Sequence, residues 1–220
     1  MLNLRLRHIA KMIEPCEVLI DIGSDHGFLP ISLLRMKVIQ TAIICDINAL
    51  PLQSAIKNAH EAHLDDRCTF IQSNGLQNYN GPVDTAVIAG MGYETIAQII
   101  KQDIERFQLI DQIILQSNTH LDKLRAFLME SKFEIVNEEL VKDRKHFYII
   151  MKVSYKGIKI EYDDSDLWIG PVLKSRNDDL MHAYLLHLYQ IEDKVLKGQK
   201  KESSKKIQVI QDHLDVIQTS

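Results

Sequence analysis

The sequence lacks paired cysteines and long apolar stretches. Its three cysteines form no CxxC pair, which argues against a disulfide framework or a zinc site and favours a reducing compartment. No apolar run reaches the ~18–20 residues that a membrane-spanning helix needs. Basic residues interrupt the apolar N-terminus at Arg5, Arg7 and Lys11, unlike the continuous apolar core of a secretory signal peptide. Together these absences predict a cytoplasmic protein that is not inserted in a membrane.

The sequence also lacks the excess of basic residues that is typical of nucleic-acid-binding domains. Its 26 basic and 30 acidic residues give a formal net charge of −4 at pH 7. A nucleic-acid partner would therefore have to be held by a local basic patch. His60, His63 and Cys68 lie close together, but no fourth ligand is evident, so we expect no metal. With 45% hydrophobic and 25% charged residues over 220 positions, the composition is that of one or two folded domains.

Strand-like and helix-like segments alternate from the N-terminus to about residue 155. Short apolar runs that end in polar residues or glycine are typical of buried parallel strands, and helices are expected between them, including one over residues 94–107. Only Lys142–Lys145 separates the last two runs, which predicts a hairpin and makes the last strand antiparallel. The sequence thus predicts an α/β fold, a Rossmann-like doubly wound sheet of seven strands. The expected strands are residues 17–23, 41–48, 68–75, 83–92, 110–118, 133–141 and 146–155.

The pattern changes after the last expected strand. Two segments with apolar residues at coiled-coil spacing follow, around residues 184–195 and 207–217, with a turn expected between them. Each apolar face is too narrow for its helix to fold alone, so we expect the two helices to pack antiparallel. We predict one domain over residues 1–157 and a helical coiled-coil domain over residues 158–220.

Three carboxylates are expected at the carboxyl edge of the sheet, where ligands bind in doubly wound folds. Asp21 and Asp46 lie at the ends of the first two strands, and Asp25 stands where a dinucleotide-binding loop has a glycine. A carboxylate there would repel a phosphate oxygen by about 1 kcal/mol in water and about 4 kcal/mol at a protein-like dielectric. The cluster suits a cationic ligand without phosphate, such as S-adenosylmethionine, with Asp46 placed to accept its ribose hydroxyls. Alternatively, Asp21 and Asp46 only cap helices and turns.

Five segments of the chain carry a family resemblance: DIGSDHGFLP, IAGMG, ILQSN, LVKDRKHFYII and WIGPVLKSRN. In this order they resemble the bacterial tRNA (adenine-22-N1)-methyltransferase family, a class I group that uses S-adenosylmethionine, over residues 1 to about 190. The resemblance implies a methyltransferase domain followed by a small helical domain, and methyl transfer to N1 of adenine 22 in tRNA. The chain departs from the family pattern at Phe28, Asn74, Tyr93 and Ser117, where the family has tyrosine, aspartate, glycine and proline.

The implied site combines contacts to the cofactor with contacts to the adenine. Adenine N1 has a lone pair at pH 7, so the reaction requires no general base and depends on positioning and electrostatics. We expect Asp25 to stabilise the cationic product, and Gln116 and Asn118 to contact the base. His26 is explained equally well as a structural turn residue and as a catalytic residue. The predicted cofactor contacts are Asp21, Gly23, Ser24, His26, Asp46, Ile47, Asn74, Gly75, Gly90, Met91 and Gly92.

The tRNA substrate that the resemblance implies adds a further set of predicted contacts. N1 lies on the Watson–Crick edge, so the adenine must be unpaired or extruded, and Phe28 or Tyr93 could stack on it. Lysines around residues 194–206 are the candidates for the tRNA backbone, although a charge run is usually only a solvated surface. The predicted tRNA contacts are Arg5, Arg7, Phe28, Tyr93, Lys200, Lys201, Lys205 and Lys206.

Other functions stay open at this level. A methyltransferase acting on a small molecule or a protein would share the fold but would not need the lysine-bearing tail. A nicotinamide oxidoreductase is disfavoured by Asp25, and a non-catalytic RNA-binding adaptor could retain the fold without activity. The leading prediction is a monomeric, S-adenosylmethionine-dependent tRNA methyltransferase.

Overall fold

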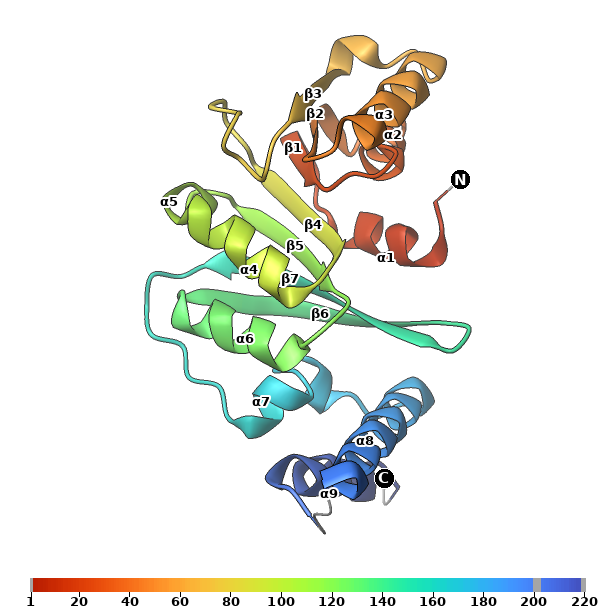
Figure 1. Ribbon diagram of the computed structural model, residues 1–220, viewed down its shortest axis with the longest axis vertical. Helices are drawn as coiled ribbons and strands as arrows, with labels where there is room; N and C mark the ends of the chain where they lie inside the picture. Colours follow the sequence, from red (N-terminus) through yellow and green to blue (C-terminus); the bar gives the residue numbers. More distant parts are fainter. Residues whose placement is uncertain (1, 200–202, 219–220) are drawn as a thin grey trace.

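A seven-stranded sheet with helices on both faces forms the centre of the protein (Figure 1). The structure is a computed structural model that describes residues 2–199 and 203–218. The strand order is β3-β2-β1-β4-β5-β7-β6; the first five of these strands are parallel, and β7 runs antiparallel to both of its neighbours. The predicted Rossmann-like sheet with a reversed last strand is therefore confirmed. The strands are β1 (Cys16–Ile22), β2 (Ile39–Asp46), β3 (Cys68–Gln72), β4 (Thr85–Met91), β5 (Gln112–Ser117), β6 (Phe133–Asp143) and β7 (His146–Tyr155).

Alternate residues of each strand face opposite layers of helices, because successive side chains of a strand point to opposite faces. In β1, Leu19 belongs to the apolar cluster shared with α1, α2 and α3, whereas Ile20 and Ile22 belong to the cluster shared with α4 and α6. Both faces of the sheet are thus buried. The helices are α1 (Leu4–Met12), α2 (Phe28–Arg35), α3 (Ala49–Glu61), α4 (Tyr93–Gln102), α5 (Ile104–Phe107), α6 (Leu121–Glu130), α7 (Asp164–Trp168), α8 (Asp179–Gln199) and α9 (Lys205–Gln218).

The single helix expected over residues 94–107 is divided into α4 and α5. Asp103 leaves the helical conformation (φ −127°, ψ 36°), and its carbonyl accepts hydrogen bonds from the amides of Arg106 and Phe107 at 2.9 and 3.0 Å. These bonds begin a new turn, which places Phe107 in a completely buried position. Apolar spacing alone does not reveal such a break, because the apolar residues continue across it.

The C-terminal helices pack on the side of the sheet that α6 covers (Figure 1). Met181 and Tyr184 of α8, and Ile210 and Leu214 of α9, are buried in the same apolar cluster as residues of α6 and β6. The two predicted tail helices are present and share a core with the sheet, while the domain boundary after residue 157 stays a prediction. None of the helices in the described part of the chain is both long enough and apolar enough to cross a membrane.

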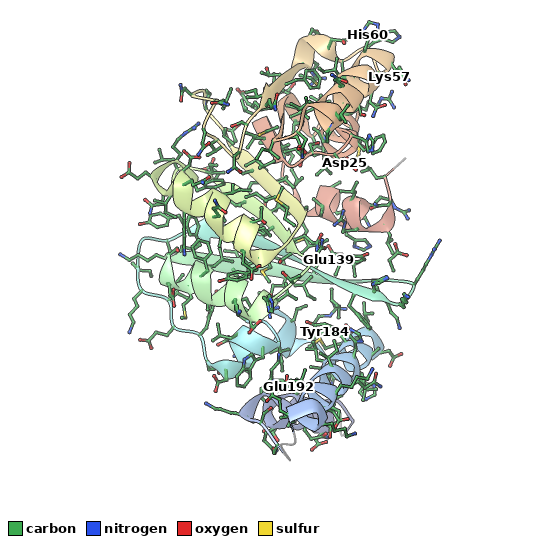
Figure 2. The ribbon with its side chains drawn as sticks, viewed as in Figure 1. Asp25, Lys57, His60, Glu139, Tyr184 and Glu192 are labelled. Atoms are coloured by element: carbon green, nitrogen blue, oxygen red, sulfur yellow. The ribbon has the colours of Figure 1, made fainter. Side chains whose placement is uncertain are left out.

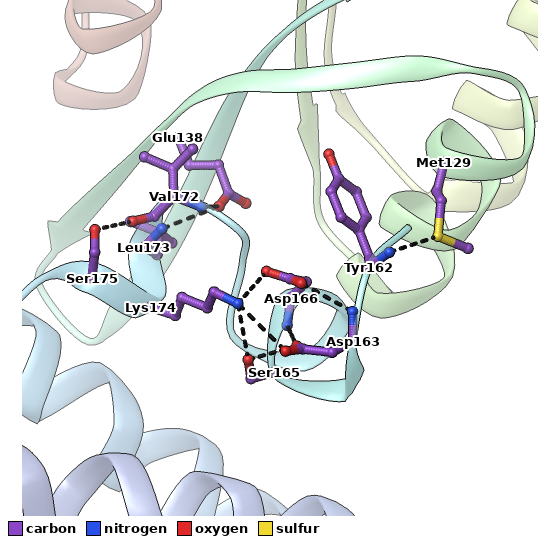
Figure 3. A network of polar contacts seen from close by, with 10 residues as sticks. All are labelled: Met129, Glu138, Tyr162, Asp163, Ser165, Asp166, Val172, Leu173, Lys174 and Ser175. Atoms are coloured by element: carbon purple, nitrogen blue, oxygen red, sulfur yellow. Dashed lines mark hydrogen bonds and ion pairs between the residues drawn. The ribbon is translucent and has the colours of Figure 1, made fainter. Parts of the chain in front are cut away.

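A buried ion pair fixes the segment that connects the sheet to the tail. Arg125 Nη2 of α6 and Glu138 Oε1 of β6 lie 2.9 Å apart, and both side chains are fully buried. Arg125 also donates to the backbone carbonyls of Leu167 and Ile169 at 2.9 and 3.0 Å. Glu138 Oε2 accepts from the amide of Val172 at 3.0 Å (Figure 3). Opposite charges on the sheet side thus bind the backbone at the start of the tail.

Gly170 lies directly against this ion pair. Its φ is +129°, and a Cβ there would be 2.3 Å from Glu138 Oε2 and 2.9 Å from Arg125 Nη2. Only glycine fits between the two charged groups. A second network next to it joins Lys174 Nζ to Asp166 Oδ1 at 2.7 Å and to Asp163 Oδ2 at 3.6 Å (Figure 3).

Candidate functional site

The loop between β1 and α2 forms one wall of a cavity at the carboxyl edge of the sheet. Gly23 has a left-handed backbone (φ +77°), and a Cβ there would lie 2.0 Å from Cε of Met91. Glycine therefore lets the end of β4 pack over this loop. The amides of Gly23 and Ser24 donate to the carbonyl of Cys45 at 2.8 and 3.1 Å, which holds the loop against the end of β2.

The cavity has a volume of about 220 Å³ and lies between this loop, α1 and β4. The structure brings several of the predicted cofactor and tRNA residues into its wall, although they come from two separate parts of the chain. Among the predicted residues, its lining includes Arg5, Asp21, Gly23, Ser24, Asp25, His26 and Phe28.

Two buried carboxylates make the inner end of this site anionic. Asp21 and Asp46 are each only 7% exposed. Burial raises the pKa of Asp21 to about 6; a hydrogen bond with Ser24 opposes the rise, and the charge of Asp46 adds to it. Burial and the same two carboxylates raise the pKa of the neighbouring Cys45 thiol to about 11. Such a donor set fits the sulfonium and ammonium of S-adenosylmethionine, because a bound cation would relieve the repulsion between the carboxylates.

Asp46 also has a structural contact, as the alternative interpretation expected. Its Oδ1 accepts a hydrogen bond from the amide of Asn48 at 2.8 Å, just before α3 begins. A carboxylate has room for further hydrogen bonds on its second oxygen, so this contact is compatible with binding of ribose hydroxyls. The predicted neighbour Ile47 is 60% exposed at the same edge.

Asp25 and Phe28 lie at the exposed side of the cavity. The Asp25 side chain is 79% exposed, and its Oδ2 lies 3.4 Å from Nε2 of His26. The imidazole of His26 in turn lies against the Phe28 ring, with 5.2 Å between ring centroids. Phe28 is 46% exposed. An aromatic face and a carboxylate therefore meet at this opening, and their action on an adenine stays a prediction.

A hydrogen-bonded network occupies the adjoining ends of β4 and β5. The Oε1 atom of Gln116 accepts from Arg5 Nη1 at 2.6 Å and from the amide of Gly90 at 3.1 Å. Its Nε2 atom donates to Asn118 Oδ1 at 3.0 Å, and Asn118 Nδ2 donates to the carbonyl of Gly90 at 2.7 Å. Gln116 is 1% exposed. Both of its amide atoms are used within the protein, so contact with a base would require this network to open.

Helix α1 brings Arg5 to this network. The Arg5 guanidinium lies over the ring of Tyr148 on β7, with 5.7 Å from Cζ to the ring centroid. A Cβ on Gly90, which has φ +82°, would lie 3.0 Å from Arg5 Nη1. Farther along α1, Nδ1 of His8 lies 2.5 Å from Oε1 of Glu139 on β6. The helix is thus fixed across β5, β6 and β7, and Arg5 contacts uncharged side chains at the cavity.

The remaining predicted cofactor residues lie at the ends of β3 and β4. The Asn74 amide donates to Gln102 Oε1 of α4 at 3.2 Å. Gly75 has φ +75°, and a Cβ there would lie 3.0 Å from Cγ2 of Ile99. Gly92 is the residue before α4. Asn74 is therefore bonded to α4, and contact of its side chain with a cofactor stays a prediction.

The predicted tRNA contacts are spread over several elements. Tyr93 begins α4 and meets the His120 ring edge-on, with 6.2 Å between centroids. Arg7 is exposed on α1. Lys205 forms an ion pair with Asp164, and Lys206 Nζ lies 3.6 Å from Glu192 Oε2. Lys200 and Lys201 lie outside the described residues. The two described lysines of this set thus have acidic partners, which reduces the net positive charge near the turn.

A family model described as tRNA (adenine(22)-N(1))-methyltransferase matches residues 19–219. The chain belongs to this family. The tRNA (adenine(22)-N(1))-methyltransferase of Bacillus subtilis (strain 168) is 25% identical over an alignment of 229 positions, and the match covers 98% of this chain and 95% of the relative. The resemblance inferred from the five sequence segments is confirmed.

Solved structures of similar proteins share the whole architecture. Sp1610 of Streptococcus pneumoniae, solved in complex with S-adenosyl-L-methionine, is 28% identical with a TM-score of 0.85, and the match covers 100% of this chain and 99% of that one. M. capricolum TrmK, solved with S-adenosyl-homocysteine, is 29% identical with a TM-score of 0.80, covering 100% and 97%. The fold of this family member therefore includes the C-terminal helices as well as the sheet.

Sequence reasoning missed part of the site of this family member. The cavity is also lined by Asn3, Leu6 and Ala89, and Tyr148 supports Arg5. Tyr148 lies in one of the segments that carry the resemblance, but no spacing rule joins it to residue 5. In the described part of the chain, no group of three or more histidine, cysteine or carboxylate residues could hold a metal ion.

Proposed function

We propose that this protein transfers the methyl group of S-adenosylmethionine to N1 of adenine 22 in tRNA. The observation that carries the proposal is the pair of buried carboxylates, Asp21 and Asp46, beside a cavity at the carboxyl edge of the sheet in a member of this family. Carboxylates are suited to a cationic cofactor and unsuited to a dinucleotide phosphate. That two relatives have been solved with this cofactor or its product supports the assignment.

The residues of the site perform positioning and charge stabilisation. The bound cofactor supplies an electrophilic methyl group, which the lone pair of adenine N1 attacks while the positive charge passes from sulfur to the base. Asp21 and Asp46 hold the cationic and ribose parts of the cofactor. Because Gly23 has no side chain, the cofactor can approach the backbone of the loop between β1 and α2. Asp25, at the exposed side of the cavity, stabilises the positive charge that the adenine acquires. No side chain has to remove a proton from N1.

Arg5 and Gln116 are assigned to the RNA side of the site. Arg5 contacts two uncharged side chains, Gln116 and Tyr148, so its guanidinium can bind a phosphate of the extruded nucleotide. Gln116 then acts as a positioning residue that aims Arg5, and Phe28 stacks on the adenine. The cytoplasmic location and the monomeric state stay predictions.

The direct test is methyl transfer to an unmodified tRNA transcript with radiolabelled S-adenosylmethionine, followed by mapping of the labelled nucleoside. Label at N1 of adenine 22 is expected, and a transcript with guanine at position 22 should take up none. Label at another nucleotide, or none on any tRNA tested, would refute the proposal.

The role of Asp25 has a separate test with a matched control. Asp25→Asn should lower the rate of methyl transfer at least about 10-fold, as loss of one charge-stabilising group does, with little change in cofactor affinity. Asp111→Asn removes an exposed carboxylate just before β5, at the opposite edge of the sheet, and should leave the rate unchanged. Equal rates for the two variants would remove Asp25 from the mechanism.

A further inference from the structure

A second cavity of about 220 Å³ opens between the β5–α6 loop and the C-terminal helices. Its walls combine a polar loop on the sheet side with aromatic, apolar and basic side chains on the tail side. The residues that matter for its chemistry are Asn118, His120, Asp122, Trp168, Leu188 and Lys206.

A hydrogen-bonded network connects this second cavity to the methylation site. Asn118 belongs to its wall and also donates to the carbonyl of Gly90 at 2.7 Å within the network that holds Arg5. His120, on the same loop, meets the ring of Tyr93. In Figure 2, Asp25 marks the first cavity, and Tyr184, which lines the second, lies toward the tail. An RNA strand that crosses from the tail to the methylation site would pass this opening.

The chemistry of the walls matches that of a nucleotide. Trp168 and Leu188 offer aromatic and apolar surface to a base, and nucleobases stack on such side chains with little regard to sequence. Asp122 offers a carboxylate acceptor to an exocyclic amine. Lys206 offers an ammonium to a phosphate, and its present partner Glu192 also accepts from Ser204 Oγ at 3.0 Å. Glu192 therefore keeps a hydrogen bond if Lys206 turns to a phosphate.

The position of Trp168 is fixed before any ligand arrives. The carbonyls of its two neighbours in the chain, Leu167 and Ile169, accept hydrogen bonds from the buried guanidinium of Arg125. The indole is thus carried by backbone that the buried ion pair with Glu138 holds in place. A preorganised aromatic surface loses little conformational entropy when a base binds.

We propose that this cavity binds one unstacked nucleotide of the tRNA, distinct from the adenine that is methylated, with its base against Trp168 and its phosphate on Lys206. The inference rests on the proposed function, since it assumes a tRNA substrate. It assigns the tail a specific recognition pocket in addition to any general attraction of its lysines for the RNA backbone.

Fluorescence gives a direct test, because Trp168 is the single tryptophan of the chain. Titration of the full-length protein with unmodified tRNA should change Trp168 emission to a saturating limit and protect it from acrylamide quenching. S-adenosylmethionine alone should leave the emission unchanged, since it binds at the first cavity. Emission and quenching that stay the same at saturating tRNA would overturn the proposal. The measurement requires tRNA binding but no methyl transfer. A negative result here would therefore refute the second cavity without refuting the proposed methylation, and a negative methylation assay would leave this result standing.

A charge variant with a matched control tests the phosphate contact. Lys206→Ala should raise the KM for tRNA about 5- to 10-fold and reduce the slope of log affinity against log salt by about 1, with kcat and cofactor affinity unchanged. The control is Lys57→Ala, whose lysine pairs with Glu61 at 3.8 Å and lies at the far end of the molecule from Glu192 (Figure 2). Identical behaviour of the two variants would refute the contact.

A variant that fills the cavity tests which base it receives. Leu188→Phe adds bulk to the wall and removes no charge, so it should raise the KM for tRNA without altering the salt slope. Thermal unfolding confirms that the variant is folded. Loss of kcat at saturating tRNA would instead mean that the cavity receives the methylated adenine itself, which would overturn the proposal.

Discussion

Replacing Asp21 by asparagine is expected to stabilise the folded protein at neutral pH while weakening cofactor binding. Burial raises the pKa of this carboxyl from the ordinary value of 3.8 to about 6 in the folded protein. At pH 7 the folded state therefore holds an ionised carboxylate that is less favourable than in the unfolded chain. At 1.36 kcal/mol per pKa unit, this rise corresponds to about 3 kcal/mol of lost stability.

The sign of the pH dependence follows from the raised pKa. Between pH 3.8 and about 6, the folded state keeps a proton on Asp21 that the unfolded state has released. The destabilisation is complete above pH 6 and is lost as the pH falls toward 3.8. For one such group the difference is about 3 kcal/mol at pH 7, roughly half of that at pH 5, and small at pH 4.

Urea unfolding of the cofactor-free protein at these three pH values measures the effect. The free energy of unfolding of Asp21→Asn should exceed that of the wild type by these amounts, because asparagine can still accept a hydrogen bond from Ser24. Asp111→Asn, which removes an exposed carboxylate, should show no such trend. A variant that is less stable than the wild type at pH 7, or a difference that is the same at pH 4 and pH 7, would refute the reasoning.

Three other expectations follow from the geometry. The affinity of the wild type for S-adenosylmethionine, measured by calorimetry, should rise about 10-fold from pH 5 to pH 7 as Asp21 ionises, and a flat profile would contradict this. Glu138→Gln should lower the free energy of unfolding in urea by about 3–5 kcal/mol, because Arg125 stays buried without its carboxylate. Gly170→Ala should also lower the free energy of unfolding, and wild-type stability in either variant would show that the connecting segment is held in another way. Arg5→Gln should weaken tRNA binding in a gel-shift assay and leave cofactor affinity unchanged. Loss of cofactor binding would show that the guanidinium binds the cofactor and not the RNA.

Local sequence patterns predicted the sheet because each strand carries its own signal. An apolar run such as Ile113–Leu115 is buried on both faces wherever it lies in a parallel sheet, and the short hairpin connection allows only one direction for β7. The boundary between α4 and α5 had no such signal. It depends on hydrogen bonds at Asp103, which apolar spacing does not encode.

The site was only partly predictable for a different reason. Asp21 and Asp25 lie in one loop, so their neighbourhood could be read from the sequence. The partners of Gln116 come from α1 and from the end of β4, and sequence spacing does not show that residues 5 and 116 are in contact. Charge counting likewise could not show that Lys205 is paired with Asp164.

The Arg125–Glu138 pair has a consequence for how the enzyme and its substrate adapt to each other. Its hydrogen bonds go to main-chain atoms of the connecting segment, including those of Leu167, Ile169 and Val172, so the tail is joined to the sheet by a rigid joint in place of a loose tether. A rigid joint keeps the distance between the first and the second cavity constant. The nucleic acid must then supply the deformation, and tRNAs whose local stacking is weakest around the target should be modified fastest.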